Sequence, residues 1–198
     1  MPQAVAFALI AGYADAVGYL RFKAFAGMMT GNTVLMGLAV FHFAELAVWE
    51  YAALLAIFFA AAIAAYLLLP RVPASALLAA EAVLILVPDF VGATWGVVFL
   101  VMAMGLQNPV AARFGVPLNT TFITGDILRF ADGVARSWQR GGASSRREPF
   151  SIYGLVWLGY AVGAAWGAAG TIWVARPLLV PVALLGFVYW WSRHHSWR

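Results

Sequence analysis

Apolar residues occur along the chain in eight stretches, separated by polar segments or by segments that contain Gly and Pro. The stretches cover residues 4–20, 30–43, 48–69, 74–87, 91–106, 122–134, 152–175 and 178–191. A helix needs about 20 residues to cross a bilayer. The third and seventh stretches meet this length, and the first, fourth, fifth and eighth meet it when flanking residues are included. We predict an all-α membrane protein with about six transmembrane helices in a single domain, residues 1–198.

The second and sixth stretches are shorter, and the linker before each is polar or irregular. Arg21 and Lys23 precede the second stretch, and Arg113, Pro117 and Asn119 precede the sixth. Irregular backbone at membrane depth is tolerated only where protein or a water-filled cavity covers it. We therefore expect two re-entrant half-helices, each of which enters and leaves the membrane on one side.

This topology separates the basic residues of the chain. One side carries Arg21, Lys23 and Arg176, and the other carries Arg71, Arg113, Arg136, Arg140, Arg146, Arg147, Arg193 and Arg198. Cytoplasmic loops of membrane proteins carry an excess of Lys and Arg. The second side is therefore predicted to be cytoplasmic, together with both termini.

Two short motifs recur in the second half of the chain. Thr-Gly-Asn begins at Thr30 and Thr-Gly-Asp begins at Thr124, while a Gly lies three residues before both Asp15 and Asn108. The two pairs have nearly the same separation, so residues 1–89 and 90–198 are predicted to be repeats. Each half has an odd number of spans, which makes the repeat an inverted one. Inverted repeats with broken helices are typical of secondary transporters.

The starts of the two half-helices are the predicted binding site. Thr30 and Thr124 are expected to cap the helices, and Gly31 and Gly125 to expose backbone to a ligand. Free N–H groups at a helix N-terminus favour an anion or a carbonyl oxygen. The alternative is an ordinary helix start, where Gly only allows close packing.

Two carboxylates lie beside this site. Asp15 is in the middle of the first stretch, and its repeat counterpart is Asn108. Asp126 follows the second Thr-Gly pair, and its counterpart is Asn32. Acidic groups inside a membrane are costly and commonly mark proton or ion pathways. Asp15 and Asp126 are therefore predicted to bind a coupling proton or ion.

Both carboxylates also have structural interpretations. Asp126 has the alternatives of capping its helix or pairing with Arg129 one turn later. Asp15 has the alternative of a hydrogen bond to Gln107 or Asn108 between helices. Tyr13 and Gln107 are candidate pocket walls by helical spacing, although packing is the simpler role for each.

Three further features have interpretations that depend on the fold. Glu81 is central in the fourth stretch, and a position near the membrane interface is favoured for it. Asp89 lies next to Pro88 and is interpreted as an ordinary turn residue. Gly159, Gly163 and Gly167 place small residues on one helix face, which suits either a dimer interface or internal packing.

Composition agrees with a membrane protein and excludes several classes. The chain is 64% hydrophobic and 10% charged, whereas soluble domains have about 25% charged residues. Cysteine is absent, which excludes disulfides, Cys-zinc sites and thiol nucleophiles. The net charge of +4 comes from residues at segment ends, so no nucleic-acid partner is expected. No enzyme motif is present, and we expect no enzymatic activity, no cofactor and no metal site at His42, His194 or His195.

Residues 11–18, 29–33, 105–108 and 121–126 resemble the YoaK family of bacterial inner-membrane proteins, a family of unknown function. The resemblance implies a multi-pass protein of the bacterial inner membrane. Asp126 departs from the small polar residue that this family has at its position. The two opposed half-helices also resemble, in fold plan, the core of uracil and sulfate permeases, which hold substrate between two half-helix N-termini. This chain lacks their scaffold domain, for which homodimerisation would substitute.

The predicted function is that of a secondary transporter for a small anion or a carbonyl-bearing metabolite, with a small-molecule substrate and membrane lipid as partners. The predicted substrate-binding residues are Thr30, Gly31, Asn32, Asn108, Thr124, Gly125, Gln107 and Tyr13. A channel-like pore is one alternative. A membrane scaffold or sensor that uses the loop 136–147 as a partner surface is another.

Overall fold

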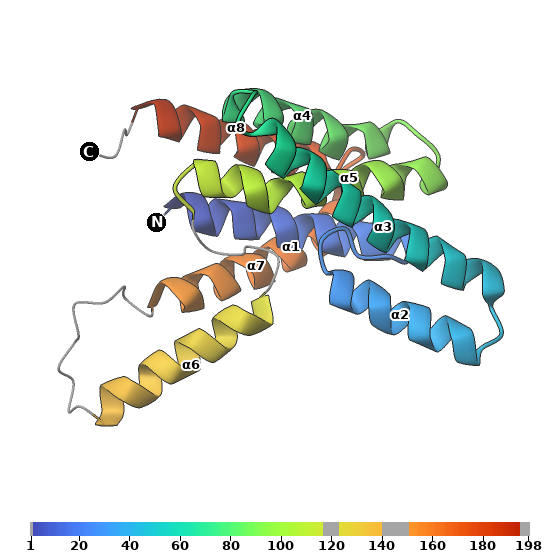
Figure 1. Ribbon diagram of the computed structural model, residues 1–198, viewed down its shortest axis with the longest axis horizontal. Coiled ribbons are helices and arrows are strands. Elements are labelled where there is room, and N and C mark those ends of the chain that lie inside the picture. The colour runs from blue at the N-terminus through green and yellow to red at the C-terminus, as the bar shows by residue number, and fades with distance from the viewer. Residues whose placement is uncertain (1, 117–122, 140–150, 195–198) are drawn as a thin grey trace.

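The computed structural model describes residues 2–116, 123–139 and 151–194, which form eight α-helices and one turn of 3-10 helix (Figure 1). The helices are α1 (Pro2–Phe22), α2 (Met29–Phe41), α3 (Glu45–Leu68), α4 (Ala74–Leu86), η1 (Val87–Asp89), α5 (Ala93–Arg113), α6 (Ile123–Gln139), α7 (Ser151–Trp173) and α8 (Leu179–His194). The prediction of an all-helical chain is confirmed for these residues.

The helices differ in their ability to cross a membrane. Four of them, α1, α3, α5 and α7, are long and apolar enough to do so. α4 has 13 residues and α8 has 16, so both are shorter than a full span. Large apolar side chains such as Phe59, Ile63 and Tyr66 project outward from α3. A surface of this kind is stable in lipid, and the chain has the character of a multi-pass membrane protein.

α1 lies at the centre of the fold. It packs against α5, α7 and α8, and its side chains Phe7, Ile10 and Val17 are fully buried. Its contact with α7 is the closest in the molecule, since a Cβ atom built on Gly163 or Gly167 would overlap the backbone of α1. The small-residue face of α7 therefore serves packing inside the chain, which was one of its two predicted roles.

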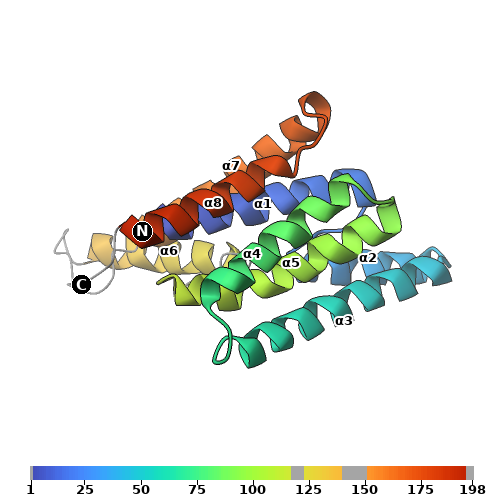
Figure 2. The same cartoon turned by 90° about the horizontal axis from the view of Figure 1, so that it is seen from above.

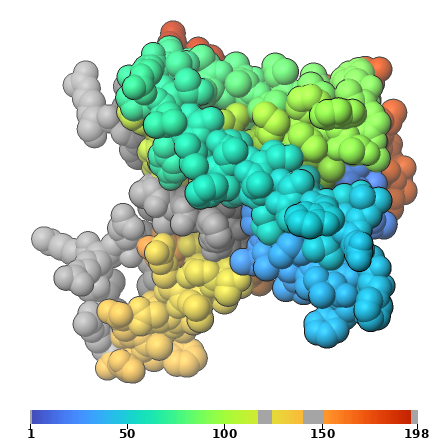
Figure 3. All heavy atoms as spheres, turned by 45° about the vertical axis from the view of Figure 1, so that its right-hand side comes forward, coloured from blue at the N-terminus to red at the C-terminus, as the bar shows by residue number. Residues whose placement is uncertain are grey.

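α2 and α6 lie outside this central bundle. α2 packs against α3, and α6 packs against α7. Both helices begin near the middle of the molecule and run toward opposite ends, α2 toward the start of α3 and α6 away from it (Figures 1 and 2). Figure 3 shows their side chains as two separate projections, coloured blue and yellow. The described start of α1 and the described end of α8 lie at the same end of the molecule (Figure 1).

The C-terminal end of the sixth predicted stretch differs from expectation. α6 extends to Gln139, beyond the predicted end at residue 134. Its added turns are polar: Arg136 forms an ion pair with Asp132, with 2.8 Å between Nη2 and Oδ2. The apolar pattern missed these turns because they are held by charge pairing on one exposed helix rather than by burial.

Asp89 is more than the turn residue that the sequence predicted. Its side chain is fully buried, and its Oδ1 lies 2.6 Å from Nη1 of Arg21 at the end of α1. Its Oδ2 accepts a hydrogen bond of 3.0 Å from the backbone N–H of Leu178, next to α8. Asp89 thus connects α1, η1 and the start of α8, a role that no local turn pattern indicates.

Candidate functional site

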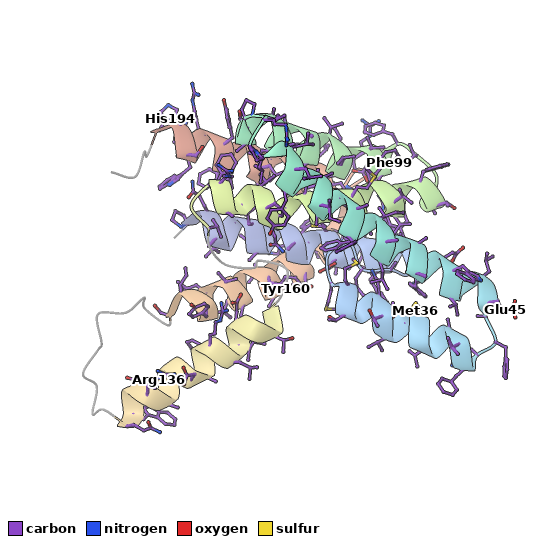
Figure 4. The ribbon with its side chains drawn as sticks, viewed as in Figure 1. Met36, Glu45, Phe99, Arg136, Tyr160 and His194 are labelled. Atoms are coloured by element: carbon purple, nitrogen blue, oxygen red, sulfur yellow. The ribbon has the colours of Figure 1, made fainter. Side chains whose placement is uncertain are left out.

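The carboxylate of Asp15 connects three parts of the fold. Its side chain is buried in the middle of α1. Its Oδ1 accepts hydrogen bonds from the backbone N–H groups of Gly27, at 2.6 Å, and Met28, at 3.1 Å. Its Oδ2 accepts a hydrogen bond of 2.6 Å from the hydroxyl of Tyr160 on α7. Figure 4 labels Tyr160 near the middle of the molecule, between the ends marked by Arg136 and Glu45.

Asp15 also holds the backbone directly before α2, through the N–H groups of Gly27 and Met28. The N-cap residue of α2 is Met28, and no side chain of the helix itself caps it. The prediction that Thr30 is the cap is wrong, because the helix begins at Met29 and Thr30 already lies within its first turn. The carboxylate of Asp15 instead satisfies N–H groups at the positive end of the helix dipole.

The backbone between α1 and α2 is held by side chains rather than by secondary structure. Asn32 is fully buried; its Oδ1 accepts a 2.8 Å hydrogen bond from the N–H of Phe25, and its Nδ2 donates one of 2.8 Å to the Phe25 carbonyl. Tyr51 of α3 donates a 3.0 Å hydrogen bond to the carbonyl of Lys23. Buried backbone groups need such partners. Asn32 and Asp15 together stabilise the irregular linker between α1 and α2.

The first turn of α2 is only partly enclosed. Thr30, in this turn, is exposed. At Gly31, a Cβ atom would lie 2.7 Å from the ring of Phe25 and 2.8 Å from the terminal methyl of Met28. The absence of a side chain at Gly31 therefore lets the linker fold over the helix start, which supports the packing interpretation of this glycine.

At the start of α6, the corresponding residues are arranged differently. Thr124 and Gly125 are exposed, and Asp126 is buried. The Oδ1 of Asp126 lies 4.0 Å from Nη1 of Arg129, and its Oδ2 has no hydrogen-bond partner among the described residues. The predicted pairing of Asp126 with Arg129 is confirmed, but the geometry is that of a weak ion pair.

Several predicted features lie outside the described residues. They are the linker residues Pro117 and Asn119, most of the loop 136–147 with Arg140, Arg146 and Arg147, and the terminal residues His195 and Arg198. The site at α6 is therefore described here only from Ile123 onward.

Tyr13 and Gln107, two further predicted site residues, take part in helix packing. The ring of Tyr13 points at α7, where its hydroxyl would overlap a Cβ atom on Gly170. Gln107 is buried and donates a 3.0 Å hydrogen bond from Nε2 to the carbonyl of Phe7, which ties α5 to α1. Asn108 is partly buried on α5. The alternative of a bond from Asp15 to Gln107 or Asn108 is wrong, since the carboxylate bonds to the linker and α7 instead.

Tyr160 is the residue that sequence analysis missed. It lies on α7, far from Asp15 in sequence, and no motif marks it. Its position follows from the close approach of α7 to α1: a Cβ atom on Gly12 would overlap the Tyr160 backbone carbonyl. The one signal in the sequence is a phenolic hydroxyl in the middle of an apolar span, because such a group requires a partner.

The chemistry of the site is that of proton binding and hydrogen bonding. Within the described part of the chain, no group of three or more His, Cys, Asp or Glu side chains is placed to hold a metal ion. Asp15 provides a buried carboxylate, Tyr160 a hydroxyl, and the first turn of α2 provides N–H groups. This combination can hold a proton and can change its bonding when the proton leaves.

Comparison with known proteins identifies one family. A family model described as "Protein of unknown function (DUF1275)" matches residues 3–191. YoaK-like membrane proteins belong to this family, so the resemblance found in the sequence is confirmed. No curated protein and no solved structure matches the chain.

Proposed function

Since the chain belongs to the DUF1275 family, whose description assigns no function, we propose from its site geometry that it is a proton-coupled secondary transporter. The transported solute is small and carries a carbonyl or anionic oxygen. The protein acts in the bacterial inner membrane, with both termini in the cytoplasm. The hydrogen bonds of Asp15 to the start of α2 and to Tyr160 carry this proposal.

Asp15 links proton binding to helix position. An ionised carboxylate accepts hydrogen bonds at both oxygens, and Asp15 uses both, toward the linker and toward Tyr160. Protonation turns one oxygen into an O–H donor. This new donor then faces the Gly27 N–H or the Tyr160 hydroxyl, which is itself donating a hydrogen bond to that oxygen. Proton binding therefore weakens the attachment of α2 to α1 or of α7 to α1. A transporter needs such a link between its coupling ion and a moving element.

The packing of the helices supports an inverted repeat of residues 1–89 and 90–198. In such a repeat, α1 to α4 of the first half correspond to α5 to α8 of the second half. The contact between α1 and α7 then corresponds to the contact between α5 and α3. In the same way, α2–α3 corresponds to α6–α7, and α4–α5 corresponds to α8–α1, and all of these pairs are in contact. α2 and α6 are the proposed re-entrant half-helices, since each begins near the middle of the molecule and the two run in opposite directions (Figure 1).

The proposed solute position is between the starts of α2 and α6. Thr30, Thr124 and Gly125 are exposed there, and they offer hydroxyl and backbone donors to an oxygen acceptor. The charge of Asp15 already lies against the α2 N-terminus. A solute oxygen at this position is therefore bound best after Asp15 takes up a proton, which couples the two ligands in the direction of cotransport.

The proposal is tested with the purified protein in liposomes that contain a pH-sensitive dye. Inward gradients of small carboxylates and of cyclic amides are applied as probes. We expect one of these classes to drive a change of internal pH in the wild-type protein. Asp15→Asn keeps an oxygen for the Gly27 N–H and an NH₂ group for Tyr160, so it should fold and yet show only the proton movement of empty liposomes.

Glu50→Gln is the matched control, because Glu50 is an exposed carboxylate on α3 and its loss should leave the signal unchanged. Solute-driven proton movement by Asp15→Asn at the wild-type rate would contradict the role of Asp15. A solute flux that rises without saturation as concentration increases would show a channel-like pore instead of a carrier.

A further inference from the structure

Glu81 is a second acidic group in the interior, and the proposed function does not use it. It lies at the middle of α4, and its side chain is fully buried. Leu77, Leu78 and Ile85, at one turn before and one turn after it, are also buried and belong to the central apolar cluster. Glu81 therefore points into the core of the protein.

Neither carboxylate oxygen of Glu81 has a hydrogen-bond partner among the residues that the structure describes. α4 packs against α5, α8 and η1, and none of the titratable groups of these elements forms a hydrogen bond with Glu81. They are Arg113 at the end of α5, Tyr189, Arg193 and His194 in the last turns of α8, and Asp89 in η1, which is bonded to Arg21. An ionised carboxylate without a cationic or hydrogen-bonding partner is not stable in such a place, and a buried group of this kind takes up a proton.

We propose that Glu81 is an intramembrane proton-binding site, separate from Asp15, whose neutral acid form is accessible from the groove between α4 and α8. The proposal concerns proton binding itself, so it stands independently of the transport function.

A groove beside Glu81 provides the access. It has a volume of about 470 Å³ and is lined by residues of α4 and α8, with Ser75 and Tyr189 as its polar members. Leu78 and Ala82 also line it, and these are the residues one turn before Glu81 and directly after it on α4. The groove therefore runs along α4 at the level of Glu81, and Leu78 belongs both to its lining and to the buried core beside Glu81.

Packing alone does not explain a glutamate at this position. An apolar residue of similar volume would fill the same space without the cost of burying a carboxyl group. Acidic groups buried within membrane helices commonly act in proton or ion movement. A single carboxyl group without further oxygen ligands cannot coordinate a metal cation, so the ligand that fits Glu81 is a proton.

Infrared spectroscopy of the purified protein in liposomes tests the protonation state directly. A protonated carboxylic acid has a C=O stretching band that a carboxylate lacks. We expect the difference spectrum between the wild-type protein and Glu81→Gln at neutral pH to contain one such band, which shifts in deuterated water. Glu50→Gln, which removes an exposed acid, should give no such band.

Labelling with dicyclohexylcarbodiimide tests access through the groove and needs no variant. The acid proton moves to a carbodiimide nitrogen, the carboxyl oxygen bonds to the central carbon, and the adduct rearranges to a stable N-acylurea with no leaving group. We expect mass spectrometry to find one intact carbodiimide added at Glu81, and labelling to slow as pH rises. A water-soluble carbodiimide should label exposed acids such as Glu45 and Glu50 in preference.

Two results would overturn the proposal. One is a wild-type spectrum with only a carboxylate contribution from Glu81, which would mean that the group is ionised in the membrane. The other is an absence of the carbodiimide adduct on Glu81 under conditions where exposed acids react with either carbodiimide. This would mean that the groove does not reach Glu81. Neither result bears on Asp15, whose test is solute-driven proton movement.

Discussion

At the scale of single residues, the site depends on how many donors surround each carboxylate. Asp15 receives three hydrogen bonds, from two backbone N–H groups and from Tyr160. Glu81 receives none. Two acids in one membrane domain are thus held in opposite ways, Asp15 by three hydrogen-bond donors and Glu81 by none among the described residues. Hydrogen-bond supply, more than depth, distinguishes them.

Tyr160→Phe is expected to destabilise the protein. It removes the donor to Oδ2 of Asp15 and leaves a buried carboxylate with one partner fewer. Hydrogen bonds to charged groups contribute about 1.5–3 kcal/mol, and a loss of this size should be measurable by thermal unfolding in detergent. Tyr66→Phe, at an exposed tyrosine of α3, is the control and should be near neutral. Equal stability of the two variants would mean that the Tyr160 hydroxyl does not hold Asp15.

At the scale of elements, glycine decides how close α1 and α7 lie. Gly163 and Gly167 of α7, together with Gly12 of α1, leave no room for a Cβ atom because the backbone of the other helix occupies it. Without strong hydrophobic attraction between helices in lipid, close packing of this kind supplies much of the attraction. The close approach also carries Tyr160 to Asp15, so the packing of these two helices builds the site.

Gly163→Ala should therefore destabilise the fold. The added methyl group would overlap the carbonyl of Leu9, and overpacking typically costs about 1–3 kcal/mol. Gly37→Ala in α2 is the matched control, since a Cβ atom there meets nothing within 4 Å. The same change at Gly37 should be neutral or stabilising by up to about 1 kcal/mol, because Ala favours helix over Gly. Thermal unfolding of the two variants side by side decides whether the contact is as close as described.

At the scale of the whole molecule, the proposed topology depends on the direction of α2 and α6. A half-helix that begins at mid-depth returns the chain to the side from which it came. The connections before and after α2 then lie on one face of the membrane, and the connection between α3 and α4 lies on the other. If α2 were a full span, the connections before and after it would lie on opposite faces of the membrane.

Single-cysteine labelling tests this arrangement in a chain that has no native cysteine. Lys23→Cys and Glu45→Cys should react with an impermeant maleimide from the same side of the membrane. Arg71→Cys and Arg193→Cys should react from the opposite side. α3 crosses the membrane between Glu45 and Arg71 in this topology, and Arg193 lies in the last turn of α8, at the end of the molecule where α1 begins (Figure 1). Labelling of residues 23 and 45 from opposite sides would show that α2 crosses the membrane.

The sequence by itself determined the class of protein and the place of its helices. Apolar stretches against polar linkers predicted all eight helices, because a bilayer demands long apolar segments wherever a helix crosses it. Six helices agree with the prediction within three residues at each end, while α5 and α6 end seven and five residues later than predicted, at Arg113 and Gln139. It also identified Asp15, since an acid within an apolar span is rare. The end of α6 was predicted less well, because exposed charge pairs leave no apolar pattern.

Only the tertiary structure decided what these residues do. It bonded Asp15 to the backbone directly before α2, brought Tyr160 to the same carboxylate, and buried Glu81 without a hydrogen-bond partner among the described residues. It also packed the glycine face of α7 against α1. The physical reason is common to all four: each depends on which helix lies beside which, and contacts between residues far apart in sequence leave no local pattern in the chain.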